Sequence, residues 1–241
     1  MEFHKLIKNL LFIDIETVSG EADLSNLSER MQKLWLHKAS FLPNPNLLSD
    51  NEFYFDRAGI YAEFGKIIVI GMSFFHWNEN EELCLKAKSI AGSNEEELLR
   101  EFKRLIEKKY RPSDLILCAH NGKEFDYPYL CRRMLINGIE IPKALQVAGK
   151  KPWEIPHLDT LEMWKFGDKK HYTSLELLSE ILHIPTSKNE LSGDMVNTAF
   201  YKEQDLDKIA RYCREDVVVL AQLYLRYQHL ELVNEDNIER I

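Results

Sequence analysis

Residues 10–17 read LLFIDIET and combine a short apolar run with two carboxylates near its end. Leucine, isoleucine and phenylalanine in such a run predict a buried strand over Leu10–Ile15. Side chains of a strand alternate between its two faces, so Asp14 and Glu16 are expected on one face. Two neighbouring carboxylates in a partly buried place are costly unless a cation compensates them. The stretch therefore indicates either a cation-binding edge of a sheet or a pair of solvated carboxylates at a strand end.

Four further apolar runs predict the rest of the sheet around this strand. Short β-branched or leucine-rich runs bounded by Gly, Pro, Asn or Ser are typical of strands. The runs Ile67–Phe75 and Leu83–Ala87 are joined by a short connection, so these two strands are expected to be antiparallel. The four runs cover Ile67–Phe75, Leu83–Ala87, Asp114–Ala119 and Leu158–Leu161.

Helical periodicity between and after these runs predicts helices that flank the sheet. Two capping boxes indicate helix starts, one formed by Ser93 with Glu96 and one by Thr173 with Glu176. A meander of three strands followed by alternating helices and strands predicts an α/β fold with a mixed five-stranded sheet, whose first strand lies near the centre. The expected helices cover Ser93–Tyr110, Tyr127–Asn137, Ser174–Leu182 and Leu206–Leu230.

Residues 19–60 form an insertion between the first and second predicted strands. The segment FLPNPNLLSDNEFYFDRAG at residues 41–59 is interpreted as a loop. Loops of this length in a compact domain are often functional, so the insertion could be a lid or substrate wall as well as plain packing. Before the loop, an amphipathic helix is predicted from the spacing of Leu24, Leu27, Met31, Leu34 and Trp35.

The composition is ordinary for a soluble globular protein. The chain has 241 residues, of which 45% are apolar and 29% are charged, and this length predicts a single domain over residues 1–241. No run reaches the roughly 18 apolar residues of a membrane span, and the apolar start is too short for a signal peptide. The four cysteines lack zinc-site spacing, which is consistent with reduced thiols. We therefore expect a cytoplasmic protein without a membrane partner.

Charge is distributed unevenly along the chain. The net charge of −8 argues against a protein that holds nucleic acid by bulk charge. The segment Arg100–Tyr172 is nevertheless basic, with 15 Lys and Arg against 10 Asp and Glu. This bias is consistent with a solvated face, or with a track that steers a phosphate backbone past aromatic stacking surfaces. The candidate side chains are Lys123, Arg132, Arg133, Lys150, Lys151, Lys165, Lys169, Lys170 and His171, with Trp153, Trp164 and Tyr172 between them.

Two more carboxylate motifs follow along the chain. Residues 120–126 read HNGKEFD and bring Asp126 to a helix start at the mouth of the sheet, where ligands of open α/β sheets gather. A plain helix cap by Asp126 is the alternative. Residues 212–216 read YCRED, and the spacing of Tyr212 and Asp216 places both on one helical face. Together the three motifs are expected only about 0.03 times by chance, so the joint pattern is specific.

The stretches DIET at 14–17, HNGKEFD at 120–126 and YCRED at 212–216 resemble the three exonuclease motifs of the DEDD superfamily. The third motif is similar to the tyrosine branch, because the histidine branch would have His where this chain has Arg211. With Asn121, the second motif is similar to the proofreading exonuclease domain of B-family DNA polymerases and to stand-alone bacterial relatives. The resemblance extends from residue 10 to about 227 and implies a ribonuclease H-like fold, with residues 19–60 the part that it places least.

This resemblance implies a site in which four carboxylates bind two Mg²⁺ or Mn²⁺ ions. These hard cations prefer oxygen ligands, and a pair of them can stabilise the attacking and leaving oxygens of phosphodiester cleavage. Asp14 is expected to bridge both ions, Glu16 and Asp216 to complete the first, and Asp126 to hold the second. Tyr212 is expected to orient the attacking water, since a phenol is mostly neutral at pH 7. A packed helical tyrosine is the alternative.

The resemblance also implies contacts to the substrate and a reaction. Thr17 is expected to contact the terminal nucleotide, Asn121 and Phe125 to support the product end, and Lys123 to steer the backbone. The expected activity is metal-dependent 3′-5′ exonucleolytic release of nucleoside 5′-monophosphates from single-stranded DNA with a free 3′ end, with RNA a less favoured substrate. An internally cutting nuclease and a ribonuclease H-fold module that only binds nucleic-acid ends are the alternatives. The sequence does not identify a polymerase or repair partner.

Overall fold

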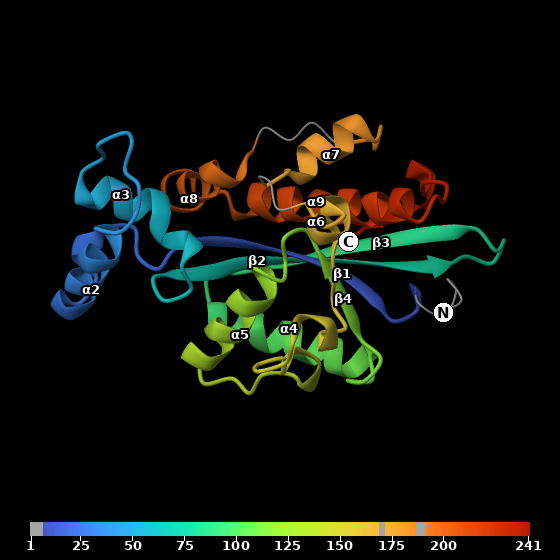
Figure 1. The fold of residues 1–241 in the computed structure, drawn as a ribbon, viewed down its shortest axis with the longest axis horizontal. Coiled ribbons are helices and arrows are strands. Elements are labelled where there is room, and N and C mark those ends of the chain that lie inside the picture. Colours follow the sequence, from blue (N-terminus) through green and yellow to red (C-terminus); the bar gives the residue numbers. More distant parts are fainter. Residues whose placement is uncertain (1–6, 169–171, 187–190) are drawn as a thin grey trace.

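The computed structural model describes residues 7–168, 172–186 and 191–241, which form an α/β fold around a mixed six-stranded sheet (Figure 1). The strand order is β5-β4-β1-β2-β3-β6, so the first strand lies near the centre, as predicted. β1 is antiparallel to β2 and parallel to β4, and β2 and β3 form the expected antiparallel pair. The strands are β1 (Leu10–Ser19), β2 (Gly65–Trp77), β3 (Leu83–Ala91), β4 (Ile116–Ala119), β5 (Leu158–Asp159) and β6 (Ile238–Arg240).

The predicted number of five strands was wrong because the sequence analysis did not include β6. This strand has three residues, Ile-Glu-Arg, and pairs in parallel with Leu85–Ala87 of β3. A segment this short and polar carries no periodicity that would indicate a strand. β6 extends the sheet beyond β3 and leaves the central position of β1 unchanged.

Helices cover both faces of the sheet (Figure 1). One face is covered by α9, with α6 and α7 beside it, and buries Phe12, Phe75 and Tyr224. The other face is covered by α4 and α5 and buries a larger apolar cluster that includes Phe102 and Tyr129. The α-helices are α2 (Glu29–Ala39), α3 (Asp50–Arg57), α4 (Glu95–Lys109), α5 (Asp126–Ile136), α6 (Thr160–Lys165), α7 (Leu175–Ile181), α8 (Val196–Thr198) and α9 (Leu206–Tyr227).

Two helix starts differ by one residue from the predicted capping boxes. The N-cap of α4 is Asn94, whose side chain accepts a hydrogen bond from the amide of Glu97. The N-cap of α7 is Ser174, which accepts from the amide of Leu177. Ser93 and Thr173 stand directly before these residues and have the same capping chemistry, so spacing alone could not separate the two possibilities.

The insertion contains more regular structure than predicted. Helix α3 lies within the segment interpreted as a loop and begins with a capping box in which Ser49 and Glu52 bond each other's backbone amides. The insertion has a small hydrophobic core of its own around Trp35, whose ring lies 5.3 Å from that of Tyr54 and 5.2 Å from that of Phe64. It lies at one end of the sheet, beside α8 (Figure 1). Part of the insertion is therefore plain packing.

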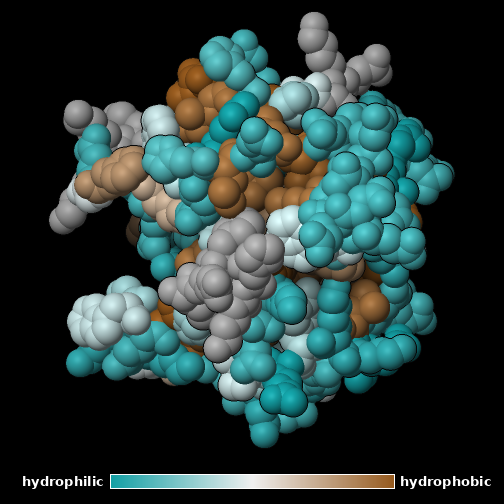
Figure 2. All heavy atoms as spheres, turned by 90° about the vertical axis from the view of Figure 1, so that its right-hand side faces the viewer, coloured by the Kyte–Doolittle hydropathy of each residue, from teal (hydrophilic) through white to brown (hydrophobic). Residues whose placement is uncertain are grey.

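The outer surface carries the charged residues expected from the composition. Figure 2 shows the end of the molecule at the right of Figure 1, where hydrophilic side chains cover most of the surface and hydrophobic ones appear between them. Among the described helices, none has both the length and the apolar sequence that crossing a bilayer would require.

Candidate active site

Asp14 and Glu16 lie together on β1, under helix α9. Asp14 is opposite Gly71 of β2, and the register shifts after Glu16, between Glu16 and Thr17. Glu16 is only 8% exposed. One ligand atom of Asp14, one of Glu16 and the Cys213 sulfur all lie within 4.8 Å of one another. The two motif carboxylates of β1 are thus close together in a nearly dry place.

Asp126 reaches the same place from the other side of β1. It is the first residue of α5, is 3% exposed, and its Oδ1 accepts a hydrogen bond from the Ile15 amide at 3.1 Å. Ile15 lies between Asp14 and Glu16, so this bond fixes the start of α5 against the two β1 carboxylates. Asp126 therefore has a long-range contact in addition to its local place at the helix start.

The loop before Asp126 is held by the buried carboxylate of Asp159. Its two oxygens accept hydrogen bonds from the amides of Asn121 and Lys123, both at 3.0 Å, and it also caps α6 through the Leu161 amide at 2.9 Å. Asn121 has a left-handed backbone with φ of 62°, a conformation that Asn tolerates better than most residues. Asp159, expected as a structural residue at a strand end, fixes the path of the loop that carries Asp126.

Tyr212 and Asp216 lie one turn apart on α9, as their spacing predicted. The Tyr212 hydroxyl interacts with the Asp216 carboxylate and lowers the pKa of that group, although burial has the larger, opposite effect. Between them, the Cys213 sulfur lies 3.4 Å from Oδ2 of Asp14. Helix α9 thus completes a cluster to which β1 and α5 also contribute.

The four carboxylates have raised pKa values because they are buried close to one another. Burial is the main cause of the rise for Asp14 and Glu16, whose pKa values lie well above the usual range, and neighbouring carboxylates add to it. Burial likewise raises the pKa of Asp126 and of Asp216 to about 7. No cationic side chain is a cause of any of these shifts among the described residues. The cluster therefore has excess negative charge that a bound cation would neutralise.

The donor chemistry of the cluster suits a hard divalent cation. Carboxylate oxygens are the ligands that Mg²⁺ and Mn²⁺ prefer. Cys213 is a poor ligand by comparison, because burial and the neighbouring carboxylates raise the pKa of its thiol and keep it protonated. Burial first, and then the charges of Asp216 and Glu16, also raise the pKa of Tyr212, so its hydroxyl stays neutral. The residues present thus fit a metal held by oxygen ligands.

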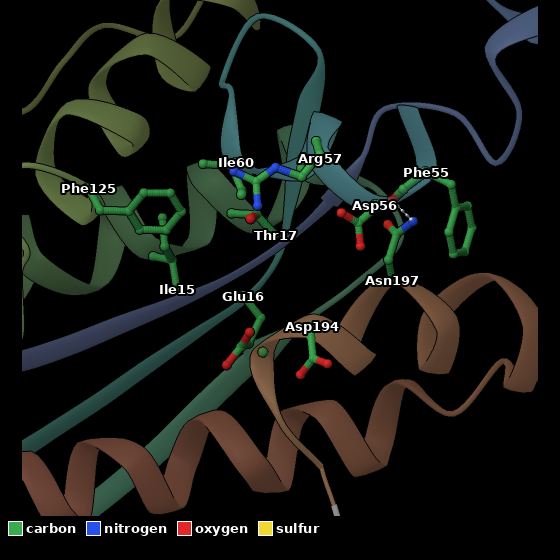
Figure 3. Close-up of a pocket in the computed structure, with 12 residues that line it drawn as sticks. Ile15, Glu16, Thr17, Phe55, Asp56, Arg57, Ile60, Phe125, Asp194 and Asn197 are labelled. Carbon is green, nitrogen blue, oxygen red and sulfur yellow. Dashed lines mark hydrogen bonds between the residues drawn. The ribbon is translucent and has the colours of Figure 1, made fainter. Parts of the chain in front are cut away.

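A pocket of about 310 Å³ opens beside Glu16 (Figure 3). Its wall comes from four parts of the chain that are distant in sequence: the end of β1, residues 55–60 of the insertion, Phe125 and residues 193–197. Asn197 connects three of these parts, since its Oδ1 accepts from the Ser19 amide and its Nδ2 donates to the Phe55 carbonyl, both at 2.8 Å. The insertion therefore supplies a wall of the pocket in addition to its packing role.

The residues expected to contact the substrate divide into two groups. Thr17 and Phe125 line the pocket. Asn121 and Lys123 lie outside its lining, and the Lys123 ammonium is paired with Glu162 at 2.6 Å. The sequence indicates the insertion as a candidate substrate wall, but no motif or periodicity singles out the remaining lining residues, which are Phe55, Asp56, Arg57, Gly59, Ile60, Gly193, Asp194 and Asn197.

The proposed basic track is smaller than its candidates suggested. Arg133 is bound inside the fold, where its Nε donates to Glu95 and its guanidinium also donates to the Ala62 carbonyl, both at 2.8 Å. Trp164 stacks on Tyr227 and belongs to a hydrophobic cluster. Trp153 is exposed, with Lys151 over its ring. Lys169, Lys170 and His171 lie outside the described residues, so the remaining candidates stay compatible with either a solvated face or a track.

Tyr172, predicted as a stacking surface, lies near enough to the carboxylate cluster for its phenol to be affected by the charges of the cluster. Its ring lies 5.8 Å from that of His120, in the edge geometry of an aromatic pair. Burial raises the pKa of its phenol, and the charges of Asp14, Asp126 and Asp216 raise it further. The hydroxyl is therefore within electrostatic reach of the cluster.

Gly71 allows α9 to approach the sheet where Asp14 lies. A Cβ at this position would be 2.7 Å from the Cys213 carbonyl oxygen and 2.9 Å from the Cys213 sulfur. We expect Gly71→Ala to lower the free energy of unfolding by about 1–3 kcal/mol, because it overpacks the contact between helix and strand. Denaturant unfolding would measure this.

Gly92→Ala is the matched control for this prediction. A Cβ at Gly92 would meet only atoms of Asn94, at 3.9 Å. Its unfolding free energy should stay within about 0.5 kcal/mol of the unmodified protein. Equal effects of the two substitutions would contradict the close approach at Gly71.

Comparisons with known proteins found a matching family, similar sequences and a similar fold. A family model described as "Predicted 3'-5' exonuclease related to the exonuclease domain of PolB" matches residues 60–239. The match begins after Asp14 and Glu16, so it does not include the motif on β1. Within the curated proteins, a "DNA polymerase" of Thermococcus litoralis is 23% identical over 180 residues, and "DNA polymerase 1" of Pyrococcus abyssi is 24% identical over 180 residues.

These matches cover 67% of this chain, but only 10% of the Thermococcus litoralis protein and 22% of the Pyrococcus abyssi protein. The solved structure of the family B DNA polymerase from Pyrobaculum calidifontis superposes with a TM-score of 0.56 and 12% identity. This superposition covers 90% of the present chain and 24% of that polymerase. At this identity the likeness concerns the fold alone, and it agrees with the ribonuclease H-like architecture.

Proposed function

This chain belongs to the family of predicted 3′-5′ exonucleases related to the exonuclease domain of PolB, and we propose that it shortens single-stranded DNA from a free 3′ end, with RNA a less favoured substrate. The observation that carries the proposal is the meeting of Asp14, Glu16, Asp126 and Asp216 beside a pocket of about 310 Å³. We propose that residues 1–241 act as one exonuclease domain.

The four carboxylates would hold two Mg²⁺ or Mn²⁺ ions. Asp14 would contribute to both ion sites, as the family resemblance implies, and it is close enough to Asp126 and Asp216 for both to add to the rise that burial causes in its pKa. Glu16 and Asp216 would complete one ion site, and Asp126 would contribute to the other. Such ions activate water and stabilise the charge of a phosphodiester undergoing displacement.

Tyr212 would orient the attacking water, with Asp216 holding its hydroxyl in place. A hydroxyl whose pKa is raised by burial and by neighbouring carboxylates stays protonated, so it is a poor base. With its proton donated to Asp216, its oxygen can accept a hydrogen bond from the attacking water. The pocket beside Glu16 would receive the 3′-terminal nucleotide, with its base against Phe125 and its sugar near Thr17. Asn121 and Lys123 would act mainly by keeping the loop before Asp126 in place.

A cleavage assay on defined ends tests this proposal. A 5′-labelled oligonucleotide incubated with Mg²⁺ or Mn²⁺ should shorten stepwise, and a chelator should stop the reaction. Parallel reactions on DNA and RNA, with single-stranded and annealed 3′ ends, would establish the substrate. Internal cuts would instead indicate an internally cutting nuclease. Binding without cleavage would indicate an end-binding module.

Replacing Tyr212 by Phe should lower kcat by roughly 10- to 100-fold, because an attacking water that is not oriented reacts more slowly. The control is Tyr110→Phe, which also removes a buried hydroxyl. This hydroxyl lies in the cluster on the α4 and α5 face of the sheet and has no hydrogen-bond partner in the part of the chain that the structure describes. Single-turnover cleavage should be unchanged in the control. A Tyr212→Phe protein with normal kcat would indicate that this tyrosine only packs.

A further inference from the structure

Arg57, the last residue of α3, places its guanidinium in the pocket wall. Its Nε is buried and makes no hydrogen bond to any residue that the structure describes. No carboxylate of the described part of the chain lies within ion-pair distance of it, although Asp56 and Asp194 line the same pocket. In Figure 3 the side chain extends from α3 toward Ile60 and Thr17.

Other arginines of this chain show how different that arrangement is. The Arg133 guanidinium is bound by Glu95 and the Ala62 carbonyl, and Arg240 is bound by Glu215 and Glu235. Arg214 and Arg226 also have a buried Nε that finds no partner within the described ranges, but neither residue lines the pocket. A buried donor without an acceptor costs stability, and an acceptor on a bound ligand would remove that cost.

The chemistry of the surrounding wall restricts what the ligand can be. Arg57 is the one basic side chain among the described residues that line the pocket. Phe125 and Ile15 offer an apolar surface, and Thr17 offers a hydroxyl. A guanidinium presents donors in a planar fork that matches two neighbouring acceptors, such as the edge of a base or two phosphate oxygens.

We propose that Arg57 is a specificity-determining residue that donates hydrogen bonds to acceptors of the 3′-terminal nucleotide, on the edge of its base. This inference rests on the proposed function, because it takes the pocket beside Glu16 as the place of that nucleotide. The same donors would also bind a phosphate at the 3′ end, so the experiment separates these two sources. The insertion is then part of the substrate site through α3.

The test compares Arg57→Gln with the unmodified protein on oligonucleotides that differ only in their last nucleotide. The ends are a normal 3′-OH nucleotide, an abasic 3′-OH residue and a normal nucleotide with a 3′-phosphate. On the normal end we expect KM to rise roughly 10-fold with kcat within about threefold, because the lost contact is made equally in the ground and transition states. On the abasic end the two proteins should have equal KM.

Two further variants separate the proposed contact from a structural effect. Arg30→Gln changes an exposed arginine of the same insertion and should leave every KM unchanged. Arg57→Lys keeps the charge but loses the planar fork. Its KM on the normal end should therefore lie between that of the unmodified protein and that of Arg57→Gln. If Arg57→Gln has a lowered melting temperature, Arg57→Lys is compared with the unmodified protein in its place.

Each outcome decides between alternatives. A KM difference confined to the 3′-phosphate end would assign the donors to phosphate and overturn the base contact. An equal loss on all three ends would show a structural role and overturn the inference, as would unchanged KM values on all ends. An unmodified protein that cleaves no end contradicts the proposed function itself, so the two failures are distinguishable.

Discussion

Replacing Asp14 by Asn should lower cleavage by at least roughly a thousandfold while leaving the protein folded. Burial is the main cause of the raised pKa of Asp14, and Asp126 and Asp216 are both close enough to raise it further. Removing the Asp14 carboxylate would take a ligand from both proposed metal positions at once. Single-turnover cleavage of a 5′-labelled DNA oligonucleotide at saturating Mn²⁺ would measure the loss.

The same substitution should make the metal-free protein more stable. Burial and repulsion raise the pKa of Asp14 well above its usual range, so its charged form is unfavourable in the fold at neutral pH. A neutral amide of nearly the same shape avoids this penalty, and the melting temperature with chelator should rise by several degrees. A variant that gains stability and loses cleavage would show that Asp14 contributes to activity at a cost in stability.

Glu79→Gln is the control for both measurements. Glu79 lies exposed in the turn between β2 and β3, away from the carboxylate cluster. Neither cleavage nor the melting temperature should change in this variant. If Asp14→Asn kept substantial cleavage, the proposed metal site would be wrong. If Asp14→Asn lowered the melting temperature of the metal-free protein, the inference that the Asp14 carboxylate destabilises the fold would be wrong.

The sheet could be predicted from the sequence where strands are long and apolar. β1, β2 and β3 have long apolar runs, and the short connection between β2 and β3 indicates that these two strands pair in antiparallel fashion. β6 could not be predicted, because its three residues pair with β3 through backbone bonds that any sequence can make. Such a segment becomes a strand because it pairs with a neighbouring strand, and not because its own residues favour one.

The insertion shows a signal that was present but not used. Ser49 and Glu52 form the same kind of capping box that indicated other helix starts, yet the prolines at 43 and 45 suggested a loop. Each proline lies before the helix, where it is compatible with an α-helix that begins later. The capping signature was the better guide to this segment.

The carboxylate cluster could be predicted because each member lies in a local motif with a recognisable spacing. The pocket wall could not, because it is made by contacts between residues far apart in the chain. Asn197 and Ser19 are 178 positions apart, and their hydrogen bond joins the segment at 193–197 to β1. Arg57 has no sequence motif of its own, and what indicates it is a buried Nε that lacks a hydrogen-bond partner among the residues described.

The metal-free protein should lose stability as the pH rises from about 4 to about 7. Burial raises the pKa of Asp126 from 3.8 to about 7, so the folded state keeps a proton that the unfolded state releases. Stability from this group is complete below the unfolded pKa and is lost as the pH approaches the folded pKa. A shift of this size corresponds to about 4 kcal/mol at most. Asp216, with a pKa also raised to about 7, changes stability in the same direction.

Asp126→Asn isolates this effect, because an amide oxygen can still accept the hydrogen bond from the Ile15 amide but does not titrate. With chelator present, the unfolding free energy of the unmodified protein should fall relative to this variant between pH 4 and pH 7. With Mn²⁺ at saturation the order should reverse, since metal binds the deprotonated carboxylate and stabilises the fold by mass action. A constant difference between the two proteins across this range would show that Asp126 does not titrate there. A Mn²⁺ effect that is equal in both would show that Asp126 is no metal ligand.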